Sequence, residues 1–222
     1  MGNSQVIHNT QEQILRAALG CFAEKGYAAA SVQEIVSRAR VSKPALYYYF
    51  ADKANLWSAL VQKAQEERYR LVREAAQRGH TVAEKLEEIT AALFSFALRN
   101  RELVRLQLAT AFGTRGQAPC GERCQTADKR NYELIRSLME AGQQSGELSS
   151  DFTADELAMG IFGQLNIYVM VRLLVPECPL DRRAASRIVR LFLAGAGARK
   201  QPVNGKLYGA KNRRWRGKSQ GA

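Results

Sequence analysis

The sequence contains no run approaching 18 apolar residues, so it predicts no membrane-spanning helix and no membrane partner. Its opening residues lack the basic start and apolar core of a signal peptide, so we expect a cytoplasmic location. A Gly-rich phosphate loop, a G-x-S-x-G motif and paired His/Cys metal spacing are also missing. These absences argue against an enzyme, the main alternative class, and we expect no catalytic residue, no cofactor and no metal.

Cysteine and histidine are scarce, with four and two residues respectively. Cys21 lies in an apolar stretch, where a free thiol behaves as a small core residue. Cys120 and Cys124 share the segment APCGERC, but this spacing is not that of a usual zinc pair and both histidines are distant in the sequence. We expect unpaired thiols in a reducing compartment, with a redox or metal switch as the alternative.

The most informative stretch is SVQEIVSRARVSKPALYYYFADKANLW, residues 31–57. It predicts two short helices joined by a tight turn and followed by the start of a third. Ser31 and Glu34 form a capping-box pattern at the first helix. Ser42 caps the second helix, and Pro44 lies in its first turn, where a missing N–H costs nothing.

The second short helix carries three consecutive tyrosines, and at most two of them can point inward on a helix. Two helices joined by such a turn form a helix-turn-helix, whose second helix places its N-terminal residues at base edges in the DNA major groove. Lys43 can bind guanine, and the Ala45 methyl can contact a thymine methyl. Tyrosine hydroxyls can bind phosphate oxygens, which position the protein on DNA.

The pattern S-x-x-x-I-x-x-x-A-x-V-S-x-x-x-L-Y-x-Y-F-x-x-K-x-x-L resembles the N-terminal domain of TetR-type transcriptional regulators, over roughly residues 11–60. The preceding QILRAALGCFAEKGY is similar to that family's first helix. The resemblance implies that the residues nearest the bases are Gln33, Lys43, Pro44, Ala45 and Tyr48. It implies that the residues nearest phosphates are Ser31, Tyr47, Tyr49 and Lys53, with Ser42 also in the DNA-binding set.

One position departs from the family pattern. The family usually has Gly in the turn, where this chain has Arg40. A non-Gly residue in the left-handed conformation that follows a helix is strained by roughly 1 kcal/mol. We therefore expect a strained turn within an otherwise intact helix-turn-helix.

We predict an all-α fold with three parts: a three-helix helix-turn-helix domain in residues 1–57, a helical effector-binding and dimerisation domain in residues 58–196, and a basic tail in residues 197–222. The net charge of +12 lies mostly in the tail, which has eight basic and no acidic side chains. Such a segment predicts disorder, and it either binds DNA phosphates or only increases solubility. We expect the first helix to run from Thr10, after a loose arm, to Gly26, and a loop over residues 113–125.

Residues 153–175 are the most apolar long segment, and Thr153 with Glu156 forms a capping box at its start. A helix that is apolar on most sides must be covered by more than one neighbour. Asp181 caps the final helix. In TetR-type proteins the last two long helices pair with the same two of a second subunit, so the resemblance implies a homodimer through residues 153–175 and 181–196. Burial within one subunit is the alternative.

A helical second domain indicates a pocket between helices for a small apolar or amphipathic effector. Among the candidates, the polar side chains are of most interest, because a buried polar group needs a partner that a ligand or water can supply. The candidate lining residues are Phe94, Leu98, Leu103, Gln107, Thr110, Phe112, Phe162, Asn166, Tyr168 and Met170.

Together these patterns predict a ligand-responsive, sequence-specific repressor that a small effector releases from a pseudo-palindromic operator. Two alternatives stay open. One is a helical architectural DNA-binding protein without an effector. The other is a transcriptional activator, because helix-turn-helix chemistry does not fix the sign of regulation.

Overall fold

The computed structural model describes residues 2–112 and 122–197, with side chains described for residues 10–108 and 129–197. Within these residues the chain forms nine helices and no strand, which confirms the predicted all-α class. The helices are α1 Gly2–Ala29, α2 Val32–Ala39, α3 Lys43–Tyr49, α4 Lys53–Ala76, α5 Val82–Arg99, α6 Arg101–Phe112, α7 Glu122–Gln144, α8 Ala154–Leu174 and α9 Arg182–Ala196.

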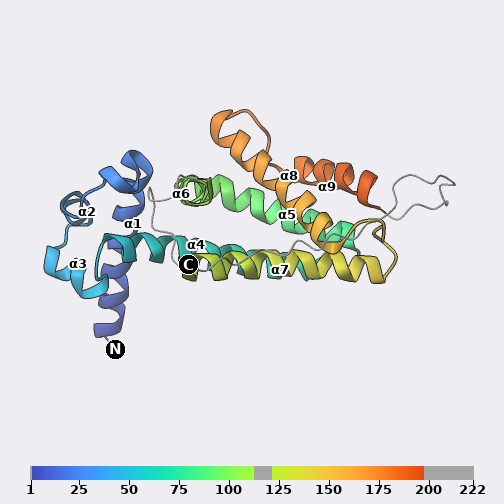
Figure 1. Cartoon of the computed structure of the whole chain (residues 1–222). Coiled ribbons are helices and arrows are strands. Elements are labelled where there is room, and N and C mark those ends of the chain that lie inside the picture. Colours follow the sequence, from blue (N-terminus) through green and yellow to red (C-terminus); the bar gives the residue numbers. More distant parts are fainter. Residues whose placement is uncertain (1, 113–121, 198–222) are drawn as a thin grey trace, which may run out of the picture.

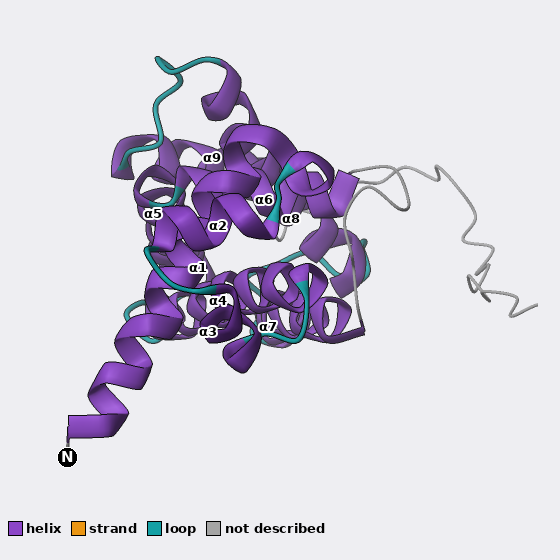
Figure 2. Cartoon of the chain, turned by 90° about the vertical axis from the view of Figure 1, so that its left-hand side faces the viewer, coloured by secondary structure: helices purple, strands orange, loops and turns teal. Residues whose placement is uncertain are grey.

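The helices divide into a small N-terminal group and a longer bundle (Figure 1). Helices α1, α2 and α3 lie at one end of the molecule, and α4 runs from them along the long axis beside α5 and α7. Helix α9 packs on α5, and α8 packs on α7 and α9. Seen from the end that carries the N-terminal group, α2 and α3 lie on different sides of α1 and α4 (Figure 2).

The predicted caps are present. The Ser31 hydroxyl accepts a hydrogen bond from the Glu34 backbone N–H at 3.2 Å, and the Glu34 carboxylate accepts one from the Ser31 N–H at 3.2 Å. The Ser42 hydroxyl accepts from the Ala45 N–H at 3.2 Å, with proline in the first turn of α3. Because the caps satisfy otherwise orphan N–H groups, they fix where α2 and α3 begin.

The capping predictions for the second domain are also confirmed. Thr153 and Glu156 form the capping box of α8, and the Asp181 carboxylate accepts from the Ala184 N–H at 2.7 Å at the start of α9. Helix α5 begins after Thr81, which forms a capping box with Glu84. Short-range hydrogen bonding thus sets the start of each of these helices.

Two predicted boundaries differ from the structure. Helix α1 begins at Gly2 rather than Thr10, because residues 3–9 contain no Pro or Gly to interrupt it. Its regular part stops at Gly26, as predicted, where φ is 77° and ψ is 166°. Helix α7 begins at Glu122, inside the predicted loop, and an acidic first residue suits a helix N-terminus. Residues 113–121, and the predicted tail after Gly197, lie outside the described residues.

Two hydrophobic cores share α4. The N-terminal core includes Trp57 and Val61, so it extends beyond the predicted boundary at residue 57 and ends inside α4. Val72 and Ala75, three and four turns further along, belong to the core of the second domain. Helix α6 also crosses between the domains, because its Leu106 is buried in the N-terminal core.

The turn between α2 and α3 has the predicted strained geometry. Arg40 has φ 54° and ψ 42°, and it is the only non-Gly residue with positive φ in the described part of the chain. The Arg40 N–H donates to the Ser37 carbonyl at 3.2 Å, and the Val41 N–H donates to the Val36 carbonyl at 3.0 Å. This is the Schellman pattern that closes a helix C-terminus, here with arginine where glycine is usual.

Arg40→Gly should stabilise the protein. Removing the Cβ relieves about 1 kcal/mol of left-handed strain, partly offset by the larger entropy of glycine in the unfolded chain. We expect the free energy of unfolding to rise by about 0.5 kcal/mol, measured by urea unfolding followed by circular dichroism.

Gly146→Ala is the matched opposite change. Gly146 has φ 75°, and an added Cβ meets no atom within 4 Å, so only backbone strain opposes the substitution. We expect a loss of about 1 kcal/mol. The claim that Arg40 is strained would be contradicted if Arg40→Gly lowered the free energy of unfolding while Gly146→Ala lowered it as expected.

Candidate nucleic-acid interface and ligand cavity

Helix α3 turns its aromatic side chains outward. Leu46 and Phe50 are buried in the N-terminal core, which leaves Tyr47 49% exposed and Tyr48 77% exposed. Tyr49 is partly buried against the core and meets Tyr48 edge to face, with ring centroids 5.0 Å apart. This contact holds the most exposed ring in place without covering it.

The polar residues predicted to contact DNA lie at the N-termini of α2 and α3. Ser31 and Gln33 are exposed at α2, and Lys43 and Pro44 are exposed at α3, with Ala45 partly buried. The Ser31 hydroxyl, like that of Ser42, accepts a capping bond but retains its own hydrogen to donate. These N-termini therefore present hydroxyl, amide and ammonium donors together with the partial positive charge of two helix ends.

Acidic side chains near α2 are paired with basic ones. The Arg38 guanidinium binds the Glu24 carboxylate at 2.6 Å, and the pKa of Glu24 is lowered by this hydrogen bond. The Lys25 ammonium binds the Glu34 carboxylate and lowers its pKa. Lys43, by contrast, makes no ion pair with any described residue, so its charge is available to an external anion.

Lys53, predicted to lie nearest phosphates, is bonded within the protein. Its ammonium donates to the backbone carbonyls of Tyr27 at 2.9 Å, Ala28 at 3.3 Å and Ala30 at 2.9 Å, and it lies 4.5 Å from the centre of the Tyr27 ring. The last carbonyls of a helix lack intrahelical partners and carry partial negative charge. Lys53 therefore ties the start of α4 to the end of α1, and its three N–H groups are directed into the protein.

The cap residue beside Lys53 supports this junction. The Asp52 carboxylate accepts from the Asn55 backbone N–H at 2.7 Å, and this bond lowers the pKa of Asp52. Asp52 thus stays ionised at the positive end of α4. The junction fixes the position of α4 relative to the helix-turn-helix.

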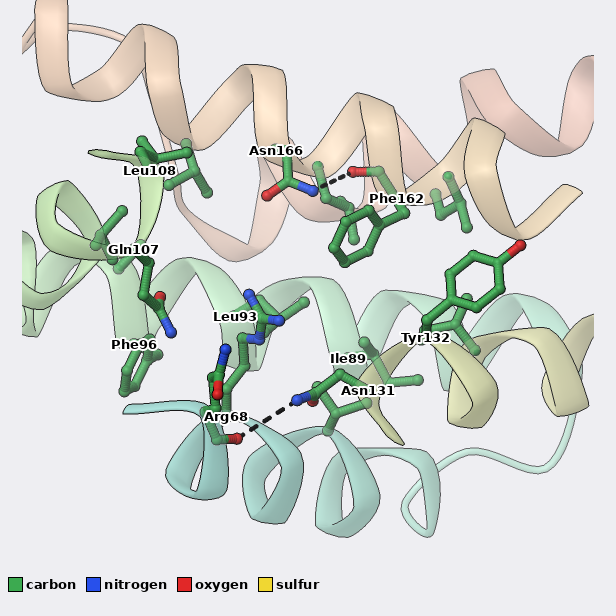
Figure 3. Close-up of a pocket in the computed structure, with 18 of the residues that line it drawn as sticks. Arg68, Ile89, Leu93, Phe96, Gln107, Leu108, Asn131, Tyr132, Phe162 and Asn166 are labelled. Carbon is green, nitrogen blue, oxygen red and sulfur yellow. Dashed lines mark hydrogen bonds between the residues drawn. The ribbon is translucent and has the colours of Figure 1, made fainter. Parts of the chain in front are cut away.

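The second domain contains a cavity of about 430 Å³ between α4, α5, α6, α7 and α8 (Figure 3). This volume lies within the range of small-molecule sites, which are mostly apolar with a few placed polar groups. Most of the wall is apolar. The lining residues are Val61, Gln65, Arg68, Val72, Leu86, Ile89, Leu93, Phe96, Ala97, Val104, Gln107, Leu108, Lys129, Asn131, Tyr132, Ile135, Ile161, Phe162, Leu165, Asn166 and Val169.

Several polar groups of the lining are held in fixed positions. The Asn166 side-chain amide donates to the Phe162 carbonyl at 2.8 Å within α8. The Tyr132 hydroxyl donates to the Asp155 carboxylate at 2.8 Å, and burial raises the pKa of Tyr132. The Arg68 guanidinium carbon lies 6.0 Å from the centre of the Phe162 ring. The amide nitrogen of Gln107 is buried, and no side chain or backbone group within the described part of the chain bonds to it.

Three of the predicted effector contacts, Gln107, Phe162 and Asn166, line this cavity. Five others do not: Phe94, Leu98, Leu103, Tyr168 and Met170. The reason is helical phase, because the wall of α5 repeats at residues 86, 89, 93 and 96, and the wall of α8 at 161, 165 and 169. Phe94 is accordingly buried in the surrounding core and Leu98 is exposed. The side chains of Thr110 and Phe112 lie outside the described residues.

Sequence reasoning missed the contributions of α4 and α7. Arg68 belongs to a mostly charged segment that predicts a solvated connecting helix, and Asn131 and Tyr132 follow basic residues in α7. The α4 residues that line the cavity are Val61, Gln65, Arg68 and Val72, so two polar residues lie between the two valines of this face and the sequence signal for a wall is weak. An arginine on such a face marks a stem packed on apolar surface.

The described residues contain no group of three or more His, Cys, Asp or Glu side chains that could hold a metal. Cys21 is a buried free thiol, as predicted. Cys120 and the side chain of Cys124 lie outside the described residues, so their predicted role stays a prediction.

An exposed helix capped at its N-terminus, on a three-helix domain joined to a helical bundle with a ligand-sized cavity, defines a ligand-binding helix-turn-helix protein. Residues 14–60 match the family model "Bacterial regulatory proteins, tetR family". The N-terminal domain therefore belongs to the TetR family of bacterial regulatory proteins.

Similar proteins are named as helix-turn-helix transcriptional regulators. The transcriptional activator FasR of Mycolicibacterium smegmatis is 32% identical over 52% of this chain and 53% of its own length. The transcriptional repressor BepR of Brucella suis is 28% identical over 67% of this chain and 73% of its own length. The match thus spans about half of FasR.

Solved structures share the fold. The fatty acid degradation regulator FadR of Bacillus halodurans aligns with a TM-score of 0.71 at 23% identity, over 83% of this chain and 98% of its own. FadR of Bacillus subtilis, solved in complex with stearoyl-CoA, aligns with a TM-score of 0.72 at 21% identity, over the same shares of both chains. The two-domain helical architecture therefore extends over most of this chain.

Two lysines provide a test of the site. Lys53→Met should lower the free energy of unfolding by about 1–2 kcal/mol, because three carbonyls lose a charged donor. Lys43→Met should leave stability unchanged, weaken DNA binding and reduce the slope of log affinity against log salt by about 1. Chemical unfolding and salt-dependent binding titrations measure both effects.

The assignment of Lys53 to the helix junction fails under one result. That result is a Lys53→Met protein of unchanged stability whose DNA affinity and salt slope fall as much as those of Lys43→Met.

Proposed function

We propose that the protein is a homodimeric, sequence-specific DNA-binding repressor that acts in the cytoplasm and is released from a pseudo-palindromic operator by a small amphipathic effector. The observation that supports it most is the pairing of two features in one chain. Helix α3 has an exposed face of Lys43, Tyr47 and Tyr48, and the bundle joined to it by α4 contains a cavity of about 430 Å³.

The DNA-reading element in this proposal is α3. Its first residues, Lys43, Pro44 and Ala45, occupy the positions that contact base edges when a recognition helix enters the major groove. Tyr47 and Tyr48 supply hydroxyl donors to the phosphates or bases beside them. Ser31 and Gln33 at the start of α2 and Ser42 at the start of α3 extend the same surface, whereas Lys53 serves the helix junction.

The dimer surface in this proposal lies on α8 and α9. Met159, Ile167 and Leu174 of α8 are 66%, 47% and 76% exposed, and Leu191 of α9 is 61% exposed. The three α8 residues share one side of that helix with Gly163, where an added Cβ meets nothing within 4 Å. An open apolar stripe of this kind is typical of a protein interface, and pairing with an identical stripe covers both copies.

The exposed apolar side of α8 has a second interpretation, which is insertion into a membrane. By length and composition alone the helix could cross a membrane, and only 22% of its most apolar window is buried. One such helix is weak evidence for membrane insertion, and its inner side packs on α7 and α9. A second copy of the chain covers the open side without removing those contacts.

The coupling between cavity and DNA runs through α4 and α6. Val61 belongs to the N-terminal core and also lines the cavity. Leu106 lies in the N-terminal core, while Val104 and Gln107 on either side of it line the cavity. A ligand that prefers a different placement of α4 and α6 therefore shifts the spacing of the two reading heads, which must match major grooves about 34–36 Å apart or a multiple.

The energy that this switch needs is modest. A ligand that binds the released state about 100-fold more tightly supplies roughly 2.7 kcal/mol, which is enough for partial release from DNA. The stearoyl-CoA complex of the similarly folded FadR supports an amphipathic effector.

The alternatives follow from the relatives. FasR is named an activator and BepR a repressor, so related chains regulate in both directions. An architectural DNA-binding protein needs no ligand cavity, so the cavity counts against that alternative. An enzyme would need catalytic residues, which a DNA-binding regulator does not need. Repression is favoured because named repressors are the more frequent among the relatives.

Footprinting tests DNA recognition. We expect protection of a pseudo-palindromic site selected from random DNA, and the combined change Tyr47→Phe and Lys43→Ala should weaken it about 10- to 100-fold, because a hydroxyl and a charge contact are lost. The matched control, Tyr69→Phe with Lys63→Ala in α4, should leave protection unchanged. Uniform coating of any duplex would favour the architectural alternative.

Sedimentation equilibrium tests the dimer. Ile167→Glu places a charge in the proposed interface, so the dimer dissociation constant should rise by about 100-fold or more. Leu98→Glu, at an exposed leucine of α5, should leave the dimer intact. A monomeric wild-type protein that binds phospholipid vesicles through α8 would contradict the dimer surface and favour membrane insertion.

A further inference from the structure

The charged groups of the cavity wall have one sign. Among the described lining residues, Arg68 and Lys129 are basic and none is acidic. The remaining polar members are amides and a tyrosine, and the rest of the wall is apolar. A bound molecule that is itself cationic would meet two like charges there, whereas an anion would meet opposite charge.

Arg68 occupies a position suited to receive the charged end of a ligand. It extends from α4 into the cavity, toward the α8 side chains that form the opposite wall (Figure 3). Its guanidinium carbon lies 6.0 Å from the centre of the Phe162 ring, so the group sits on apolar surface rather than in bulk water. A guanidinium in such surroundings binds carboxylate or phosphate oxygens through paired N–H donors.

Helix α6 contributes a further donor to the cavity wall. The Gln107 amide nitrogen is buried and has no hydrogen-bond partner among the described residues, and Figure 3 shows its side chain extending into the cavity. A buried donor that lacks a partner is unfavourable, so an acceptor atom in the cavity would be bound there. Two further polar groups of the wall donate to protein acceptors: the Tyr132 hydroxyl to the Asp155 carboxylate, and the Asn166 amide to the Phe162 carbonyl.

We propose that the effector is an amphipathic anion, with a carboxylate or phosphate head that Arg68 and Gln107 bind and an apolar chain that lies along Ile89, Leu93 and Phe162. This inference rests on the proposed function, since it names the chemical class of the effector. It also gives the head group a route to the DNA-binding domain. Gln107 is adjacent to Leu106, which is buried in the N-terminal core.

Four probes with the same apolar chain separate head-group charge from hydrophobicity. They are dodecanoate, dodecyl phosphate, dodecanol and dodecyltrimethylammonium, each titrated below its micelle-forming concentration into the full-length protein by calorimetry. We expect at least one anion to bind ten-fold or more tightly than dodecanol, and the cation to bind most weakly. The ratio of the dissociation constants of dodecanoate and dodecyl phosphate distinguishes a carboxylate head from a phosphate head.

Substitutions at Arg68 locate the head group. Arg68→Met should lower the affinity for the two anions about 10- to 100-fold and leave the affinity for dodecanol unchanged, because only the charged hydrogen bonds are lost. Arg68→Lys keeps the charge but not the paired donors, so it should weaken them less. Gln107→Leu should weaken the anions more than dodecanol.

Arg130→Met is the matched control. Arg130 also lies against an aromatic ring, 4.6 Å from the centre of Tyr69, and binds the Glu66 carboxylate at 2.6 Å, but it does not line the cavity. We expect its probe affinities to equal those of the wild type. If Arg68→Met does not fold, as judged by circular dichroism, the comparison of Arg68→Lys with Arg130→Met takes its place.

The outcomes separate this inference from the proposed function. Equal binding of dodecanol and both anions, preference for the cation, binding of none of the probes, or anion affinities unaffected at Arg68 would overturn the anionic effector, and operator footprinting of the ligand-free protein would still stand. Absence of any footprint would overturn the repressor, while the ranking of the probes would still test the cavity.

Discussion

The burial of one helix in two cores is the constraint on which the rest of the structure depends. Trp57 and Val61 of α4 pack among α1, α2 and α3, while Val72 and Ala75 of the same helix pack in the bundle. An uninterrupted helix transmits rotation and tilt, because its hydrogen-bonded backbone bends little between these two ends. The orientation of α3 is therefore set by whatever fills the space around the far half of α4.

Lys53 makes this constraint effective at the near end. Without a bond between the start of α4 and the end of α1, α4 could pivot at Trp57 without moving the small domain. The Lys53 ammonium holds three carbonyls at 2.9–3.3 Å from the last turn of α1 and the loop after it. The small domain and the first turns of α4 consequently behave as one body.

The sequence predicts what local chemistry decides. The helix starts at residues 31, 42, 153 and 181 follow from side-chain caps, and the left-handed turn at Arg40 follows from the position that glycine usually takes. The all-α class and the outward face of α3 follow from apolar spacing. These features depend on residues three or four positions apart, which a single sequence displays.

Features that depend on distant residues could not be predicted in the same way. The family resemblance places Lys53 nearest phosphates, whereas its bonds go to the carbonyls of Tyr27 and Ala30, which lie more than twenty residues earlier in the sequence. The cavity face of α5 and α8 depends on the rotation of each helix, so the sequence predicts Phe94 and Tyr168 as lining residues and does not predict Arg68. Composition alone does not distinguish a charged stem that covers apolar surface from one in water.

Leu106 has a consequence for how the molecule is made. The N-terminal core contains residues of α1 to α4 and this single leucine from α6, which is only 3% exposed. During synthesis the small domain leaves the ribosome some forty residues before the side chain that completes its interior. A fragment ending within α4 would retain every group that faces DNA yet expose an apolar gap, so the reading head gains its full stability only as part of the longer chain.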